Sequence, residues 1–216
     1  MTAYLLGYLW ADGHLYDYGR NRRITISVVE NDGIYLLPLF EKTGIWRTYR
    51  HERKTCGPNS KPQLQIYIQD KQLFEWLKDC GYKKKSGKSP NLILNHIPEN
   101  IHHYFWRGYI DGDGCFYVRP NGKSPEFSIS STYNQDWASA KLLCKYLGIH
   151  YTIRKRIHKL GRGSCFIILR RNDIRKLGQY LYKDFDGIIG LTRKYDKYQK
   201  INSYNTKPGR KSLVIK

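Results

Sequence analysis

Two stretches of the sequence, Leu5–Gly13 (LLGYLWADG) and Trp106–Gly114 (WRGYIDGDG), align with each other without a gap at a constant offset of 101 positions. Each reads as a short apolar helix that is closed by a glycine. Gly13 and Gly114 fit the left-handed residue that commonly ends a helix. We therefore expect two copies of one structural unit, each opening with such a helix.

Small residues lie four positions apart in both helices: Gly7 and Ala11 in the first, Gly108 and Gly112 in the second. This spacing places each pair on one helix face, where a second backbone can approach closely. Glycine inside a helix costs up to about 1 kcal/mol relative to alanine, so close packing explains its presence. We expect the two helices to pack against each other through these faces.

Asp12 and Asp113 stand in the last turn of their helices. The negative pole of the helix dipole disfavours a carboxylate there by about 0.3–1 kcal/mol, and parallel pairing of the helices would add mutual repulsion. Divalent cations would remove both penalties, and the carbonyls of Ala11 and Gly112 offer further oxygen ligands of the kind that Mg²⁺ accepts. The competing interpretation is an ordinary Asp-Gly turn, which explains one copy better than two copies in register.

Both stretches resemble the LAGLIDADG motif of homing endonucleases, the second more closely than the first, and the order of elements between them also fits that family. The resemblance implies that Asp12 and Asp113 bind the catalytic metal, Mg²⁺ or another divalent cation such as Mn²⁺. The first copy has Trp10 where an earlier aspartate usually stands, whereas the second keeps Asp111. Because that position is not the metal ligand, we do not interpret Trp10 as inactivating.

Hydrophobic periodicity and turn residues predict the same order of elements in both halves. The elements expected in the first half are 2–12, 14–18, 22–29, 31–44, 45–53, 63–69 and 71–80. Those expected in the second are 101–113, 115–119, 126–131, 134–147, 151–158, 165–171 and 173–182, with a last helix at about 191–201.

These elements predict an α+β fold of two pseudo-symmetric αββαββα lobes that pack through the paired motif helices. The antiparallel sheets would lie side by side and form a DNA-binding saddle, an architecture that the family resemblance also implies. The expected lobes are residues 1–82 and 99–202, separated by a basic linker at 83–98 and followed by a basic tail at 203–216.

Composition points to a polyanionic partner. The formal charge is +20, from 38 Lys and Arg against 18 Asp and Glu, an excess typical of proteins that bind nucleic acid. The bland alternative is a basic surface without a specific partner. A membrane partner is not expected, because the sequence has neither a long apolar run nor a basic amphipathic anchor.

The cysteines indicate an intracellular, reducing compartment. They are odd in number and scattered, without a Cys-x-x-Cys pair, so we expect reduced, mostly packed thiols and no zinc site. A secretory peptide is not expected, since the first residues lack a basic region and a cleavage signal. The five are Cys56, Cys80, Cys115, Cys144 and Cys165.

The outward positions of the predicted strands carry residue types that read DNA bases. A two-stranded ribbon fits the major groove, where Arg and Lys donate to guanine and Gln pairs with adenine. A merely solvated polar face is the alternative for any one of them. The candidates are Arg20, Arg22, Arg23, Arg47, Gln63, Gln65 and Gln69 in the first half, and Arg119, Lys123, Arg154, Arg156, Arg162 and Arg170 in the second.

The family also places a lysine near each catalytic centre, after the last helix of each lobe, to stabilise developing charge. By position in the repeat these correspond to Lys88 and Lys194. A phosphate-facing or solvated lysine is the alternative for each.

Three functions follow from these features. The leading one is a monomeric, site-specific endonuclease that hydrolyses both strands of a long, asymmetric DNA target with a divalent metal; the family resemblance implies that the cuts are staggered. The others are an RNA-binding splicing cofactor (maturase) that acts on intron RNA and a DNA-binding regulator that does not cut. The presence of both Asp12 and Asp113 favours the nuclease.

Overall fold

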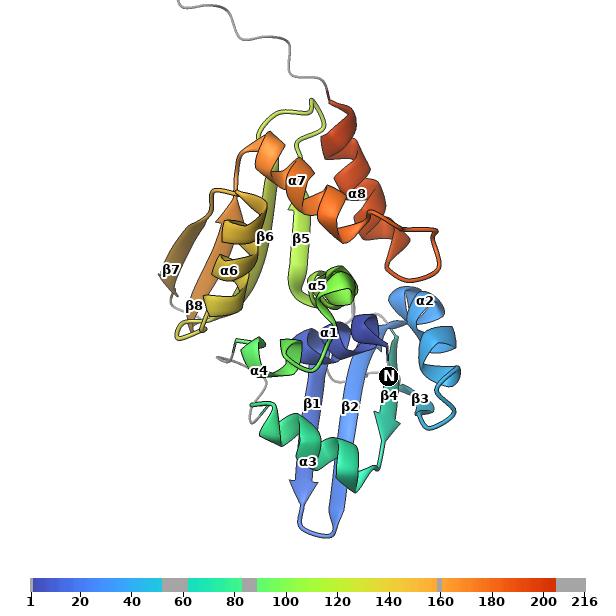
Figure 1. The fold of residues 1–216 in the computed structure, drawn as a ribbon. Helices are drawn as coiled ribbons and strands as arrows, with labels where there is room; N and C mark the ends of the chain where they lie inside the picture. Colours follow the sequence, from blue (N-terminus) through green and yellow to red (C-terminus); the bar gives the residue numbers. More distant parts are fainter. Residues whose placement is uncertain (1, 52–61, 83–88, 159–160, 205–216) are drawn as a thin grey trace, which may run out of the picture.

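The computed structural model describes residues 2–51, 62–82, 89–158 and 161–204, and these form two lobes of the same design (Figure 1). The first lobe contains α1 (Ala3–Asp12), β1 (Gly13–Tyr18), β2 (Asn21–Val29), α2 (Glu30–Glu41), β3 (Arg47–His51), β4 (Gln63–Ile68) and α3 (Lys71–Asp79). The second contains α5 (His102–Asp113), β5 (Gly114–Tyr117), β6 (Glu126–Thr132), α6 (Ala138–Leu147), β7 (Thr152–His158), β8 (Gly161–Ile168) and α7 (Arg171–Leu181). The predicted αββαββα order is confirmed in both.

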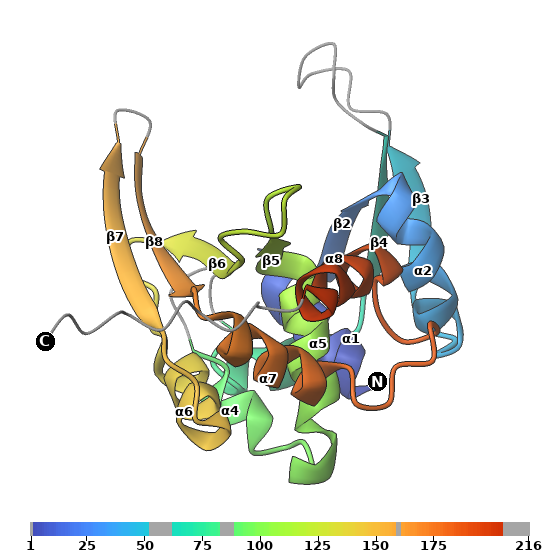
Figure 2. The same cartoon turned by 90° about the horizontal axis from the view of Figure 1, so that it is seen from above.

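Each lobe holds one four-stranded antiparallel sheet. The strand orders are β1-β2-β4-β3 and β5-β6-β8-β7, so the two sheets have the same topology. Alternation along the strands gives each sheet one apolar face, with Ile24, Ile26 and Ile66 in the first lobe and Phe127 and Phe166 in the second, all buried. Seen from above, the outer strands β3 and β7 rise on opposite sides of the molecule, while α1 and α5 lie between the lobes (Figure 2). This is the predicted saddle.

The helices α1 and α5 touch through their small residues, as predicted. A Cβ atom added to Gly7 would lie 1.9 Å from the carbonyl oxygen of Phe105, and one added to Gly108 would lie 2.0 Å from that of Tyr4. Farther along, the same construction on Gly112 meets the Cβ atom of Ala11 at 2.5 Å. Because partners advance along both helices together, the helices run parallel and end at the same place.

The expectation of left-handed glycines after the motif helices is wrong. Gly13 has φ −74° and ψ 161°, and Gly114 has φ −80° and ψ 154°, so both are extended and pass directly into strands β1 and β5. Glycine is required there by space instead, because an added Cβ would lie 2.3 Å from the carbonyl oxygen of Leu9 or 2.7 Å from that of Ile110. The left-handed glycine is found where α6 ends, at Gly148 with φ 60°.

Two further elements differ from the sequence-based expectation. The predicted basic linker contains a short helix, α4 (Asn91–Leu94), which is followed by a 3₁₀ turn, Glu99–Ile101. The start of this segment is tied to the second lobe, since the amide of Ser139 donates to Ser89 Oγ at 2.7 Å. Helix α6 begins four residues later than predicted because the preceding residues form a turn, with Asp136 accepting from the amide of Ala138. Within the described ranges, none of the helices has the length and apolar character needed to cross a bilayer.

A buried arginine fastens α5 within the second lobe. Arg107 is only 1% exposed. Its guanidinium donates to the carbonyls of Leu181 at 2.7 Å and Ile189 at 2.9 Å, and to Asp184 at 2.6 Å. These bonds satisfy a charge that would otherwise be costly to bury, and they fix the motif helix to the end of α7.

The last helix, α8 (Thr192–Ser203), connects the second lobe to the first. Arg193 at its start forms a bidentate ion pair with Asp32 in the first turn of α2, at 2.6 and 2.5 Å. Both views place the start of α8 beside α2 (Figures 1 and 2). The lobes are therefore joined by this ion pair as well as by the contact of the motif helices.

We predict that Gly7→Ala lowers the free energy of unfolding by about 3 kcal/mol or more, since overpacking against a rigid backbone outweighs the roughly 1 kcal/mol gain in helix propensity. Chemical denaturation monitored by circular dichroism measures this. Gly33→Ala in α2 is the matched control, because its added methyl meets side-chain atoms of Leu64 and Val28 and no backbone atom among its nearest neighbours; we expect a change within about 1 kcal/mol. Equal effects of the two substitutions would contradict the close contact of α1 and α5.

Candidate active site

The parallel packing brings Asp12 and Asp113 to one place. Both carboxylates are half-buried at the adjoining ends of α1 and α5. Oδ2 of Asp12 lies 3.2 Å from the position that a Cβ of Gly112 would take, so the absence of a side chain at that residue leaves the space beside this carboxylate. Both carboxylates also act electrostatically on the buried hydroxyl of Tyr82. The structure thus gathers the two acidic groups that the sequence singled out.

The end of each motif helix is held by a buried side chain from the end of its own lobe. In the first lobe the Tyr82 hydroxyl hydrogen-bonds with the carbonyl of Leu9 at 3.1 Å and with that of Gly13. In the second, Nζ of Lys194 donates to the carbonyls of Ile110 at 2.8 Å and Gly114 at 2.5 Å. Leu9 and Ile110 also accept from the amides of Gly13 and Gly114, so each capping side chain shares a carbonyl with the last backbone bond of its helix.

Burial shifts the pKa values of Tyr82 and Lys194, the two groups that cap the motif helices. It raises the pKa of Tyr82 well above its usual range, and the charges of Asp12 and Asp113 act in the same direction. Burial also lowers the pKa of Lys194 to about 8, against the opposing attraction of Asp111. At neutral pH the phenol is therefore neutral, whereas the ammonium is predominantly charged.

Asp111 is buried near the end of α5 and does not line the space next to Asp113. It is 1% exposed and accepts hydrogen bonds from the Tyr4 hydroxyl at 2.9 Å and from the amide of Leu191 at 2.8 Å. Burial raises its pKa to about 6, with Lys194 acting in the other direction. In the first lobe the corresponding residue, Trp10, contacts the ring of Tyr82 edge-on at 5.2 Å between ring centres. Both residues are buried, and the interpretation that Trp10 does not inactivate the site stays a prediction.

The donors at this site suit a hard divalent cation. Two carboxylates meet there, and Ala11 and Gly112 lie in the last turns of their helices, where carbonyls can serve as additional oxygen donors. No group of three or more His, Cys, Asp or Glu side chains comes together among the described residues. The assignment of Asp12, Asp113, Ala11 and Gly112 as metal ligands stays a prediction.

Of the two predicted lysines, Lys194 is among the residues that the structure describes. Lys194 reaches the second centre, but it is 5% exposed and its ammonium is engaged by backbone carbonyls. In this structure it contacts the end of α5, and its catalytic role and direct contact with DNA stay predictions. Lys88 lies outside the described residues. Sequence patterns do not single out Tyr82, which has no charge and stands in no motif.

The open face of the first sheet carries most of the DNA-reading candidates from this lobe. Arg23 pairs in register with Tyr16 on β1, and Gln65 pairs with Tyr49 on β3. Arg47 is exposed, Gln63 and Gln65 are half-buried, and Gln69 follows the same alternation past the end of β4. The sequence-based selection missed the tyrosines, although two of them hold Arg23: its guanidinium lies 5.3 Å from the ring centre of Tyr16 and 5.7 Å from that of Tyr67.

Arg22 does not lie on that open face. Its guanidinium forms an ion pair with Glu75 of α3 at 2.6 Å and lies over the ring of Phe74, so it belongs to the helix-covered side of the sheet. The residue alternates with Arg23 along β2, which is why both cannot face the same way. Arg20 is exposed in the β1–β2 turn.

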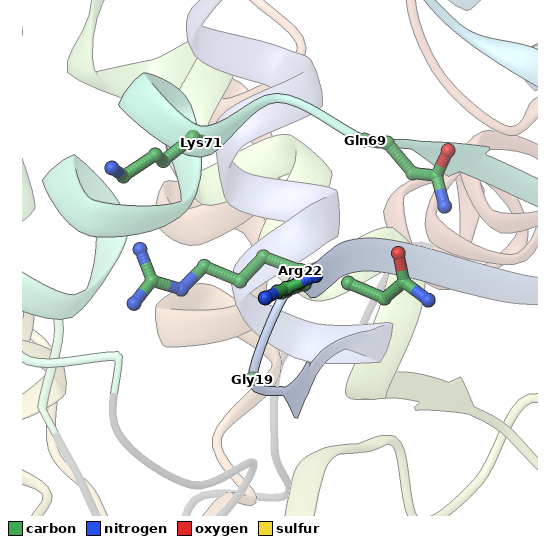
Figure 3. A pocket seen from close by; sticks show the side chains of 6 residues that line it. Gly19, Arg22, Gln69 and Lys71 are labelled. Atoms are coloured by element: carbon green, nitrogen blue, oxygen red, sulfur yellow. The ribbon is translucent and has the colours of Figure 1, made fainter.

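A polar pocket of about 420 Å³ opens at this end of the first sheet. Figure 3 shows Arg22 and Lys71 extending on one side of it, with the amide of Gln69 on the other. Its lining residues are Gly19, Arg20, Asn21, Arg22, Gln69 and Lys71. Lys71 is a further candidate cation that the strand patterns could not identify, because it starts α3.

Among the candidates on the strands of the second sheet, the described side chain is that of Arg154. Arg154 is exposed on β7 and pairs in register with Cys165, beside Ser130 of β6. Arg119 and Lys123 lie in the β5–β6 loop and are joined by a backbone hydrogen bond of 3.2 Å. This loop contains the predicted Asn121-Gly122 turn, although it is longer than a two-residue hairpin turn.

The other three candidates of this lobe lie farther along the chain. Arg156 and Arg162 lie in β7 and β8, where the register pairs Arg156 with Gly163 and Arg162 with Ile157. Arg170 is the residue before α7, beyond the end of β8, so it is exposed but does not belong to the sheet face. Of the cysteines, Cys80, Cys115, Cys144 and Cys165 are free thiols, in agreement with the expected reduced state, while Cys56 lies outside the described residues.

Comparison with known proteins gives a family match and structural matches. Residues 100–182 match the family model described as a LAGLIDADG-like domain. No curated protein sequence matches the chain.

The solved structures that resemble the chain include "The homing endonuclease I-WcaI bound to its DNA recognition sequence", with TM-score 0.63 and 14% identity over 91% of this chain and 84% of that one. They also include the I-SmaMI LAGLIDADG homing endonuclease bound to cleaved DNA, with TM-score 0.57 and 14% identity over 93% and 87%. The I-GzeII homing endonuclease in complex with its DNA target gives TM-score 0.56 and 13% identity over 93% and 88%. The chain therefore carries a LAGLIDADG-like domain at residues 100–182 and has the two-lobe fold of the single-chain LAGLIDADG homing endonucleases.

Proposed function

We propose that this protein is a site-specific DNA endonuclease that uses divalent metal, Mg²⁺ or Mn²⁺, to hydrolyse both strands of a long asymmetric duplex and leave staggered ends. The observation that carries the proposal is the meeting of Asp12 and Asp113 at the adjoining ends of α1 and α5, between two open sheet faces. The resemblance in fold to homing endonucleases whose structures contain DNA supports it.

The residues at the helix ends divide the chemical tasks. Asp12 and Asp113, with the carbonyls of Ala11 and Gly112, would hold the metal. Metal bound there would activate a water molecule, neutralise charge at phosphorus and assist the leaving oxygen. Tyr82 and Lys194 fix the helix ends by bonding their carbonyls, so the carboxylates keep a constant position. Holding the reacting groups in a fixed orientation contributes much of the rate enhancement in such reactions.

The sheet faces would hold the duplex. Cationic and amide side chains on the first sheet are suited to base edges in the major groove, and Arg23 is kept extended by the rings of Tyr16 and Tyr67. The cationic pocket at Arg20 and Lys71 is suited to a backbone phosphate farther from the centre. The two faces carry different side chains, which accounts for an asymmetric target. A monomer suffices, because one chain supplies both aspartates.

The proposal predicts that the native protein linearises members of a plasmid library in Mg²⁺ and that Asp113→Asn abolishes this activity. Asp79→Asn is the matched control: Asp79 is also the last residue of a helix, but that helix is α3 and the residue is exposed. We expect it to cut at the native rate. Cutting by Asp113→Asn at the native rate would refute the assignment of the site. Salt-sensitive DNA binding without cutting would indicate a regulator, and preference for folded intron RNA would indicate a maturase.

A second prediction concerns Arg47 and Arg50, which alternate on β3 and face opposite sides of the sheet. Arg50 is held by Glu30 at 3.2 Å, whereas Arg47 is exposed on the open face. We expect Arg47→Ala to weaken DNA binding by about 1–3 kcal/mol for the cognate sequence if it contacts a base, or to reduce the salt slope by about 1 if it contacts a phosphate. Fluorescence anisotropy at several salt concentrations distinguishes these results. An equal effect of Arg50→Ala would show that the open face is not the DNA surface.

A further inference from the structure

The turn between β5 and β6 presents two cationic side chains at one end of the second lobe. Arg119 and Lys123 are both exposed, and the amide of Arg119 donates to the carbonyl of Lys123 at 3.2 Å. The amide of Gly122 donates in turn to the carbonyl of Arg119 at 2.8 Å. Figure 2 shows this turn rising on the same side of the molecule as the outer strands β3 and β7. The two cations thus lie on a closed turn, on the side proposed to receive the duplex.

Tyr204, which follows the end of α8, packs against this turn. Its hydroxyl donates to the carbonyl of Pro120 at 3.0 Å. Its ring lies over Gly122, where φ is 73° and an added Cβ would be 2.3 Å from ring atom Cδ1. Glycine therefore satisfies two requirements at this position, a left-handed backbone and the space for the ring.

Two arginines of α7 join the end of α8 to the turn. The guanidinium of Arg171 donates to the carbonyl of Ile201 in α8 at 2.8 Å and also to that of Gly122, so one side chain bridges the helix and the turn. It lies 5.7 Å from the ring centre of Tyr204. Arg175 donates to the carbonyl of Tyr204 at 2.9 Å. Arginine side chains commonly bind the last carbonyls of a helix, and here they extend that cap to a neighbouring turn.

Helix α8 is also anchored at its start and along its length. Arg193 pairs with Asp32 of the first lobe. Farther along, the ring of Tyr198 fills the space beside Gly178 of α7, where an added Cβ would lie 1.9 Å from it. At 1.5 Å per residue α8 is about 18 Å long, and it runs from the start of α2 to the β5–β6 turn (Figure 1). A helix of fixed length that is anchored at both ends fixes the distance between the lobe junction and this turn.

The two lobes differ in how they support this turn. In the first lobe the β1–β2 turn has two residues, and the strand register closes it by pairing Tyr18 with Asn21. In the second lobe the connection covers residues 118–125. A longer connection loses more conformational freedom when it is closed, so contacts from outside the hairpin contribute more to its order.

We propose that Tyr204 and Arg171 are positioning residues for DNA recognition, because they hold the β5–β6 turn where Arg119 and Lys123 contact the duplex. The inference rests on the proposed function and adds the element that supports the reading surface of the second lobe. A turn that is ordered before binding loses little freedom when its cations meet DNA, so less of their interaction energy is offset. Tyr204 and Arg171 act through the turn in this account and do not touch the nucleic acid.

The test measures DNA binding without cutting. The probe is a fluorescent duplex that the native protein selects from a randomised library, and anisotropy is recorded at several salt concentrations without divalent cations. Replacing both Arg119 and Lys123 by Ala should weaken binding and reduce the salt slope by about 1 to 2. Tyr204→Ala should weaken binding by roughly fivefold, the lower limit for loss of a direct base contact.

A double-mutant comparison separates positioning of the turn from a general defect. In the protein that already lacks both turn cations, Tyr204→Ala should change the affinity by less than about twofold, because the turn then has no contact left to lose. Tyr146→Ala is the matched control, since Tyr146 is also an exposed tyrosine but lies on α6. We expect native affinity for it.

Gly122→Ala disturbs the same contact from the side of the turn. Its methyl group would displace the ring of Tyr204, so we expect the loss seen with Tyr204→Ala. Gly44→Ala is the control for backbone strain, because Gly44 has nearly the same φ, 71°, and an added Cβ meets nothing within 4 Å; its affinity should stay native. Circular dichroism establishes that each variant is folded. If Tyr204→Ala does not fold, Gly122→Ala and its control decide.

Three results would overturn the inference. Native affinity in Tyr204→Ala and Gly122→Ala would do so, as would a loss that persists undiminished in the protein without the two turn cations. Unchanged binding after removal of both cations would show that the turn does not meet DNA. A native protein that selects and binds a duplex but does not cut it in Mg²⁺ would refute the endonuclease and leave this inference standing, whereas failure to select any duplex would refute both.

Discussion

The structure depends on one contact, the direct approach of the α1 and α5 backbones. It is reciprocal, since Gly7 lies against the carbonyl of Phe105 and Gly108 lies against that of Tyr4. A side chain at either glycine would separate the helices, and their ends would then no longer adjoin. Because the contact is parallel, it places Asp12 and Asp113 at the same end, and the sheets that follow each helix open on the same side (Figure 2). The position of the candidate site is thus a consequence of backbone packing.

The same contact makes the charged state of the two carboxylates energetically unfavourable. Two acidic groups stand together at two negative helix poles, and the protein relieves the poles with the caps of Tyr82 and Lys194. The symmetry of the backbone does not extend to these caps. A duplicated fold therefore holds two sites whose immediate electrostatic surroundings differ, and the difference lies in side chains that come from the ends of the lobes.

Much of this architecture can be predicted from the sequence, because local patterns determine it. The repeated motifs predict the helix contact, and alternation on β2 and β4 predicts the sheet faces. The predictions that were wrong or missing concern features that depend on tertiary contacts. Gly13 and Gly114 are extended because strands follow at once and the space beside them is filled. The alternation of β2 turns Arg22 to the side opposite Arg23, and what the strand pattern does not show is that Glu75 of α3 pairs with it there. Tyr82 lies far from the motif in sequence, so no pattern at the motif indicates that it caps α1.

The central claim is that the paired helix ends form a site for divalent cations between Asp12 and Asp113. The most direct test is anomalous diffraction at the manganese edge from crystals of the protein with a selected target duplex and Mn²⁺. The account predicts anomalous density within coordinating distance of both carboxylates and of the DNA backbone. Manganese bound elsewhere, or carboxylates that face away from the duplex, would contradict it.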